Sequence, residues 1–115
     1  MRVAACKLDE IDDGAMKALE VNGRAVVLIR RGDDVAALRN VCPHQGATLS
    51  GGVVSCRRVA AGVGEYVADV SAGVVRCPWH NWEFDTESGT CFHRDDQRVA
   101  VYRVEVEGGE VFLNL

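Results

Sequence analysis

The sequence predicts an all-β domain, and three observations support this prediction. Residues 100–107 alternate apolar and polar side chains with a period of two, which is the pattern of a half-buried strand. Turn signals built on glycine recur at short intervals along the chain. No long stretch has the spacing of an amphipathic helix. Short strands joined by turns favour a β-sandwich or a barrel-like arrangement.

The N-terminal part, residues 1–41, has β character. Residues 16–21 and 24–29 flank Asn22-Gly23, a dipeptide that tolerates positive φ and therefore favours the type I′ turn of a hairpin. A polar turn then leads into residues 35–38, Val-Ala-Ala-Leu, which is the one N-terminal stretch with helical tendency.

The middle of the chain predicts a second hairpin. Residues 53–56 and 65–70 have strand character on either side of a Gly62-Val63-Gly64 turn, so we expect a hairpin over about residues 53–70. Residues 47–52 before it look like a loop, and residues 74–76 read as the next strand.

The C-terminal part continues in the same manner. Residues 82–85 alternate before a turn at Glu87-Ser88-Gly89. The strand over residues 100–107 ends at Gly108-Gly109, which predicts a last hairpin onto residues 111–115.

Length and charge limit what the protein can be. A chain of 115 residues, 48% of them hydrophobic, is expected to form one domain over residues 1–115 with a modest core that a bound metal would help to stabilise. A net charge of −4 without a basic stripe argues against a nucleic-acid partner. The N-terminus lacks the apolar core of a signal peptide, and no apolar run reaches membrane-spanning length. We therefore expect a cytoplasmic protein with no membrane partner.

Two short fragments combine cysteine with histidine. They are Cys42-Pro43-His44 and Cys77-Pro78-Trp79-His80, and each offers one thiolate and one imidazole. In a reducing compartment such a grouping more often binds metal than forms disulfides, and two sulfur with two nitrogen donors suit zinc or an iron–sulfur centre. Cys6, Cys56 and Cys91 lie outside the fragments and are expected to be small reduced strand residues.

The order of the donors helps to choose between these metals. A structural zinc site usually takes a pair of cysteines from one turn and a pair of histidines from another. Here each fragment mixes its donors. That arrangement suits a two-iron cluster in which both cysteines bind one iron and both histidines bind the other.

These residues closely resemble the Rieske family of [2Fe–2S] proteins, whose motif is C-x-H followed by C-x₂-H. The resemblance includes residues 42–47, residues 75–85, Ser88-Gly89 and the terminal strands. It implies an antiparallel β-sandwich with a cluster-binding subdomain formed by two loops, at about residues 40–93. It also implies one [2Fe–2S] cluster per chain, with the cysteines on a buried iron and the histidines on an outer one. The implied ligands are Cys42, His44, Cys77 and His80.

The chain departs from the family pattern in two places. Many members separate their two motifs by about half as many residues, so residues 53–70 are interpreted as an inserted hairpin. The loop around His93 has no proline, although family members often place a proline-bearing loop over the cluster. His93 is expected to be an exposed loop residue rather than a ligand.

The resemblance also carries an expectation about reduction potential. High-potential members have an extra cysteine in each loop and two hydroxyl groups that donate to sulfur. This chain has Ala47 and Trp79 at the cysteine positions, and Trp82 and Phe84 where the hydroxyls would be. Lost hydrogen bonds to sulfur lower the potential, so we expect a value below about 0 mV.

The implied function is electron transfer rather than catalysis. Oxygenases of the same family need a second iron site built from two histidines and a carboxylate, and after cluster ligation only His93 remains. The leading interpretation is a soluble one-electron carrier between a flavin- and NAD(P)H-dependent reductase and a terminal oxygenase. One alternative is a permanently bound small subunit of a larger oxidoreductase such as nitrite reductase. A second alternative is a zinc-stabilised or cluster-free interaction module.

Overall fold

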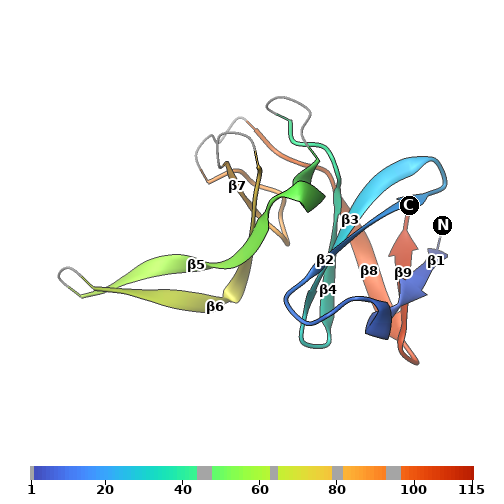
Figure 1. The fold of residues 1–115 in the computed structure, drawn as a ribbon, viewed down its shortest axis with the longest axis horizontal. Helices are drawn as coiled ribbons and strands as arrows, with labels where there is room; N and C mark the ends of the chain where they lie inside the picture. The colour runs from blue at the N-terminus through green and yellow to red at the C-terminus, as the bar shows by residue number, and fades with distance from the viewer. Residues whose placement is uncertain (1, 44–47, 63–64, 79–81, 93–96) are drawn as a thin grey trace.

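The computed structural model describes residues 2–43, 48–62, 65–78, 82–92 and 97–115. Within these ranges the chain forms antiparallel strands and two short 3₁₀ turns, η1 at Leu8–Glu10 and η2 at Leu49–Gly51, so the all-β prediction is confirmed (Figure 1). The strands are β1 Arg2–Lys7, β2 Met16–Val21, β3 Arg24–Arg31, β4 Asp34–Arg39, β5 Val53–Gly62, β6 Glu65–Arg76, β7 Glu83–Asp85, β8 Val101–Glu107 and β9 Glu110–Asn114.

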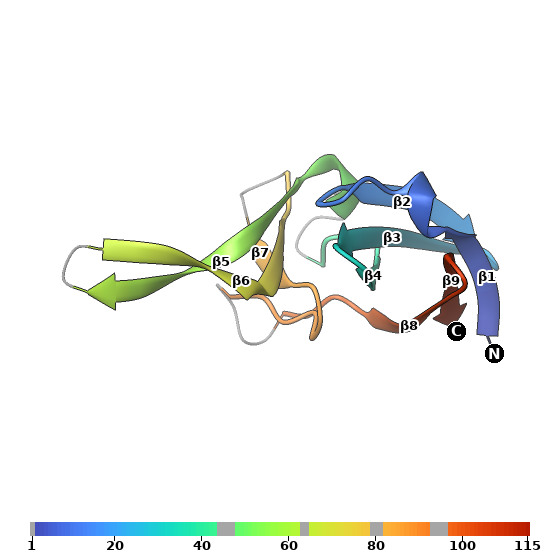
Figure 2. The ribbon, with the colours of Figure 1, turned by 90° about the horizontal axis from the view of Figure 1, so that it is seen from below.

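The strands form two sheets. Six strands pair in the order β1-β9-β8-β4-β3-β2, and three pair in the order β5-β6-β7. The larger sheet curls, so that its two halves face each other, and the long β5–β6 hairpin projects away from it (Figures 1 and 2). The described helical segments include none that is long and apolar enough to cross a membrane.

Strand β3 separates two hydrophobic cores. Its residues Val26–Ile29 are all buried, because successive side chains of a strand point to opposite faces and both faces are covered here. Val26 and Leu28 belong to what we call the sheet core, inside the curled sheet: Ile11, Val21, Val26, Leu28, Ala37, Val111 and Leu113. Val27 and Ile29 belong to the loop-side core, which faces the smaller sheet: Val27, Ile29, Leu38, Cys42, Leu49, Val75, Cys77, Phe84, Cys91 and Val99.

The turn chemistry of the first hairpin agrees with the sequence prediction. Asn22 and Gly23 both have positive φ, 49° and 78°, as a type I′ turn requires. Val21 pairs with Arg24 directly across this turn. Gly108 and Gly109, with φ of 57° and 77°, close the last hairpin in the same way.

The helical tendency of residues 35–38 is overridden by pairing. This stretch lies in β4, which pairs with β3 on one side and with β8 on the other. Ala37 and Leu38 are buried, one in each core. Packing on two faces and backbone pairing on two edges outweigh the modest intrinsic preference of alanine and leucine for a helix.

The second predicted hairpin is longer than expected. Its two strands pair from Val53 opposite Arg76 to Gly62 opposite Glu65, so residues 74–76 continue β6 rather than forming a separate strand. The register shifts between Cys56 and Arg57. The turn at residues 63–64 lies outside the described residues, and the view of residues 53–70 as an insertion stays a prediction.

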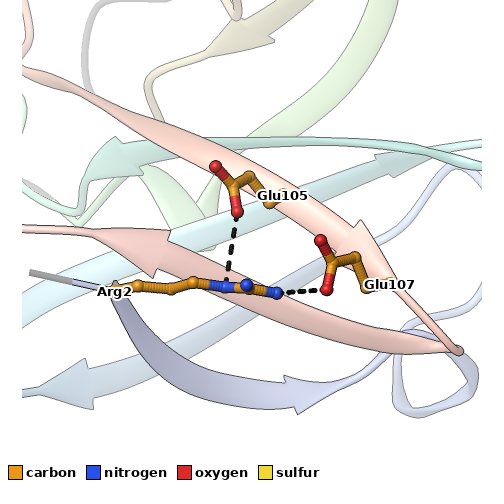
Figure 3. A network of polar contacts seen from close by, with 3 residues as sticks. All are labelled: Arg2, Glu105 and Glu107. Atoms are coloured by element: carbon orange, nitrogen blue, oxygen red, sulfur yellow. Dashed lines mark hydrogen bonds and ion pairs between the residues drawn. The ribbon is translucent and has the colours of Figure 1, made fainter.

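Arg2 links edge strand β1 to the two strands beside it, β9 and β8 (Figure 3). From β1 its guanidinium crosses β9, lying 3.9 Å from the centroid of the Phe112 ring. It then reaches two carboxylates of β8, Glu105 at 3.3 Å and Glu107 at 2.7 Å. The hydrogen bond with Glu107 raises the pKa of Arg2 above its ordinary value.

Leu28→Ala should test the sheet core. Leu28 is fully buried on β3, so its truncation is expected to lower the free energy of unfolding by about 2–5 kcal/mol. The matched control is Val101→Ala on β8, because Val101 is 40% exposed and its truncation should cost under about 0.5 kcal/mol. Urea unfolding followed by circular dichroism gives both values, and equal losses would contradict the described core.

Candidate metal centre

The first cysteine of the predicted site lies at the end of β4. The backbone N–H of Arg39 donates to the Ala100 carbonyl at 2.9 Å, and the chain then turns inward at Asn40. Cys42 is a free thiol, 1% exposed, in the loop-side core. Pro43 directly after it is exposed, so the chain passes from core to surface between these two residues. His44 lies outside the described residues.

A reciprocal pair of hydrogen bonds closes this first loop. The Asn40 side-chain oxygen accepts from the backbone N–H of Ser50, and the Asn40 amide nitrogen donates to the Ser50 hydroxyl, both at 2.9 Å. The backbone N–H of Asn40 donates to the carbonyl of Ala25 on β3 at 3.0 Å. The fully buried Leu49 packs next to Ser50 in the loop-side core. Both ends of the loop are thereby fixed to the sheet.

The second cysteine follows β6 in a similar way. Cys77 is 1% exposed and belongs to the same loop-side core as Cys42. Its backbone N–H donates to the Trp82 carbonyl at 2.7 Å, which closes the loop that carries Trp79 and His80. Those two residues lie outside the described part of the chain. Pro78 is exposed, so this loop also leaves the core immediately after its cysteine.

The two loops meet at Gly52. A Cβ atom built on this residue would lie far inside van der Waals distance of the Arg76 carbonyl oxygen. Arg76 directly precedes Cys77, and its strand partner is Val53, directly after Gly52. The absence of a side chain at Gly52 therefore lets the end of the first loop lie against the start of the second.

The structure brings together the sulfur half of the predicted ligand set. Two cysteines from distant segments share one apolar core, from which water is excluded. Soft thiolates held in this way suit an iron–sulfur centre or zinc. Among the described residues, which include neither His44 nor His80, no group of three or more possible metal ligands occurs. The complete ligand set of Cys42, His44, Cys77 and His80 stays a prediction.

A third buried cysteine lies in the same core. Cys91 forms an isolated backbone bridge with Phe84, as expected of a small residue in extended structure. Its N–H donates to the Gln97 carbonyl at 3.2 Å, closing the segment that contains His93, which lies outside the described residues. Nothing in the sequence spacing indicates that Cys91 shares a core with the two motif cysteines.

The remaining cysteines are strand residues. Cys6 is a partly buried free thiol of β1, and its pKa is raised first by burial and then by the nearby Glu10 carboxylate. Cys56 lies in β5.

Trp82 and Phe84 contribute packing at the second loop. Phe84 is fully buried in the loop-side core, and the partly buried Trp82 packs against that core. The sequence does not predict the contacts of Asn40, Ser50 and Gly52; its only signals are the places of these residues just before and just after the first motif.

Comparisons with known proteins show the family and the fold of the chain. The family of Rieske [2Fe–2S] domains matches residues 1–103. The chain is 26% identical over 111 residues to the ferredoxin component of the alkene monooxygenase system of Xanthobacter autotrophicus, covering 96% of this chain and 79% of that protein.

Two solved structures have the same fold. The ferredoxin of carbazole 1,9a-dioxygenase from Nocardioides aromaticivorans has a TM-score of 0.76 at 29% identity, covering 98% of this chain and 96% of that one. A structure from Mycobacterium tuberculosis, described as an NADH-dependent nitrite reductase small subunit, has a TM-score of 0.81 at 26% identity. That comparison covers 98% of this chain and 93% of the other.

Gly52→Ala should separate the two loops. The added methyl group collides with the backbone of Arg76, so we expect a loss of about 1–3 kcal/mol in unfolding free energy together with reduced iron content. Gly51→Ala is the matched control, because a Cβ there meets only ordinary contacts at 3.5 Å and 3.7 Å and should cost under about 0.5 kcal/mol. Thermal unfolding and iron analysis of both variants check this. Equal iron content in the two would contradict the loop contact.

Proposed function

The chain belongs to the Rieske family of [2Fe–2S] domains, and from that premise we propose that it is a one-electron carrier between a flavin- and NAD(P)H-dependent reductase and a terminal oxygenase. Its cofactor is a single [2Fe–2S] cluster. The supporting observation is the convergence of Cys42 and Cys77 in one dry core from two loops that touch at Gly52. Among the relatives that match over most of their own length are ferredoxins of oxygenase systems.

The described residues fit the sulfur side of such a cluster. Cys42 and Cys77 would bind one iron, while His44 and His80 would bind the other. When bound, the cluster supplies a centre that accepts and donates a single electron. The fully buried Leu49 and Val75 share the core with the cysteine sulfurs and keep water from them.

The backbone direction supports an outer position for the histidines. Each cysteine is buried and the proline directly after it, Pro43 or Pro78, is exposed. Each histidine follows its proline within two residues of sequence. The described part of each loop therefore runs outward from cysteine to proline, and we expect the histidines, with the electron's entry and exit, on that outer side.

A second candidate is a permanently bound small subunit of a larger oxidoreductase. The likeness to the nitrite reductase small subunit favours it, since that TM-score is as high as those of the ferredoxins. Size analysis of the protein from its native source separates the two functions. A carrier is recovered alone, whereas a subunit is recovered in a complex of constant composition.

Electron paramagnetic resonance of the anaerobically reduced protein tests the cofactor and its cysteine ligands together. We expect a rhombic signal from the wild type and its loss in Cys42→Ala and in Cys77→Ala, because each removes a thiolate from the cluster. Cys91→Ala is the matched control, since Cys91 is equally buried in the same core but is not a proposed ligand. A colourless wild type with stoichiometric zinc would exclude the carrier function. Loss of the signal in Cys91→Ala alone would refute the ligand assignment.

The reduction potential should lie at the low end of the family range. Phe84 has no hydroxyl, and Trp82 packs against the core, so neither provides the hydroxyl donor found at these positions in high-potential members. Without such donors the negative charge on reduced sulfur is less stabilised, and we expect a midpoint below about 0 mV. Protein-film voltammetry measures this value. A strongly positive midpoint would contradict the role assigned to the missing hydroxyls.

A further inference from the structure

Asn40 is an unusual residue in the described core. Asn40 and Thr86 are the only buried polar residues in the described part of the chain, and 6% of the Asn40 surface is exposed. A buried amide is costly unless its polar atoms are hydrogen-bonded, and Asn40 directs both ends of its side chain to Ser50. Its own backbone N–H is bonded to Ala25 of β3. Asn40 therefore links β3 to the far end of the first loop.

The location of this pair relates it to both cysteines. Asn40 stands two residues before Cys42, and Ser50 stands two residues before Gly52. Gly52 in turn lies against the carbonyl of Arg76, the residue before Cys77. A short path therefore connects Cys42 with Cys77. It follows the backbone, the Asn40–Ser50 hydrogen bonds and the contact between Gly52 and Arg76.

The other contacts of the turn that contains Ser50 do not hold it in place of the Asn40–Ser50 hydrogen bonds. Turn η2 has backbone hydrogen bonds within itself, from Gly51 to Thr48 and from Gly52 to Leu49, and Thr48 makes no side-chain cap bond. Leu49 anchors the turn by burial alone, which is not directional. Loss of the Asn40 amide should therefore leave the domain folded while the first loop gains freedom to move.

We propose that Asn40 is a positioning residue for the cluster: through Ser50 it holds the first ligand loop against the second and thereby limits cluster loss. The proposal rests on the proposed function, because it takes Cys42 and Cys77 as cluster ligands. Ligands that are held in place by their supporting residues retain a metal centre more firmly, and loss of such support commonly costs tenfold or more.

The test compares four variants of the cluster-loaded protein: Asn40→Ala, Ser50→Ala, Ser50→Thr and Thr86→Val. The first readout is the rate at which visible absorbance bleaches in excess chelator, and the second is the reduced paramagnetic spectrum. Asn40→Ala should lose its cluster about tenfold faster than the wild type and broaden the spectrum. Ser50→Ala should show a smaller effect in the same direction, since the bond from the Ser50 N–H remains. Ser50→Thr keeps the hydroxyl and should restore wild-type behaviour.

Thr86→Val separates positioning from simple stability. Thr86 is also a buried polar residue, and its hydroxyl donates to the Gly73 carbonyl at 3.3 Å, outside both ligand loops. Its replacement should lower thermal stability while the bleaching rate and spectrum stay at wild-type values. Equal bleaching of Thr86→Val and Asn40→Ala would overturn the proposal, because the effect would then follow stability alone.

The remaining outcomes are also decisive. If the wild type gives the rhombic signal and Asn40→Ala bleaches at the wild-type rate, the positioning role is overturned and the carrier function stays intact. No signal in the wild type would overturn both, since there would be no cluster to hold. If Asn40→Ala does not fold, the Ser50→Ala and Ser50→Thr pair decides, and identical bleaching in those two would overturn the proposal.

Discussion

The contact between Gly52 and the Arg76 carbonyl is the constraint on which the site depends. Two cysteines that are far apart in sequence have to reach one core, and each arrives at the end of a different sheet. Strand β4 of the six-stranded sheet leads to Cys42, and β6 of the three-stranded sheet leads to Cys77. Gly52 is where these two routes touch, because only a residue without a side chain can approach that carbonyl so closely.

Packing in the two cores stabilises the position of this contact. Strand β3 contributes Val27 to the loop-side core and Leu28 to the sheet core, so any shift of the strand would disturb packing on both of its faces. Asn40 is hydrogen-bonded to β3 through Ala25. The position of the first loop is thereby set by a strand in which Val26–Ile29 are all buried. Electron transfer benefits from such an arrangement, because groups fixed beforehand need little rearrangement when charge moves.

Local sequence signals predicted the parts of the fold that depend on neighbouring residues. The Asn22-Gly23 turn could be identified because positive φ at both positions is a property of those residues themselves. The strand over residues 35–38 could not, because its pairing with β3 and β8 is a long-range interaction that outweighs a local helical preference. The extra length of the β5–β6 hairpin was missed for a related reason: a register shift at Cys56 is not visible in a period-two pattern.

The sequence predicts the chemistry of the site, but it does not predict the residues that hold the ligand loops in place. Cysteine and histidine at motif spacing predict the donors directly, since few other residue types can bind iron at such positions. Asn40 and Ser50 carry no such signature, because asparagine and serine are ordinary loop residues and their pairing across the loop exists only after folding. Ligand identity is therefore encoded locally, whereas ligand position is encoded by contacts between segments. A substitution near the motifs can therefore leave every donor in place and still weaken the site, because it changes the distance between the two loops.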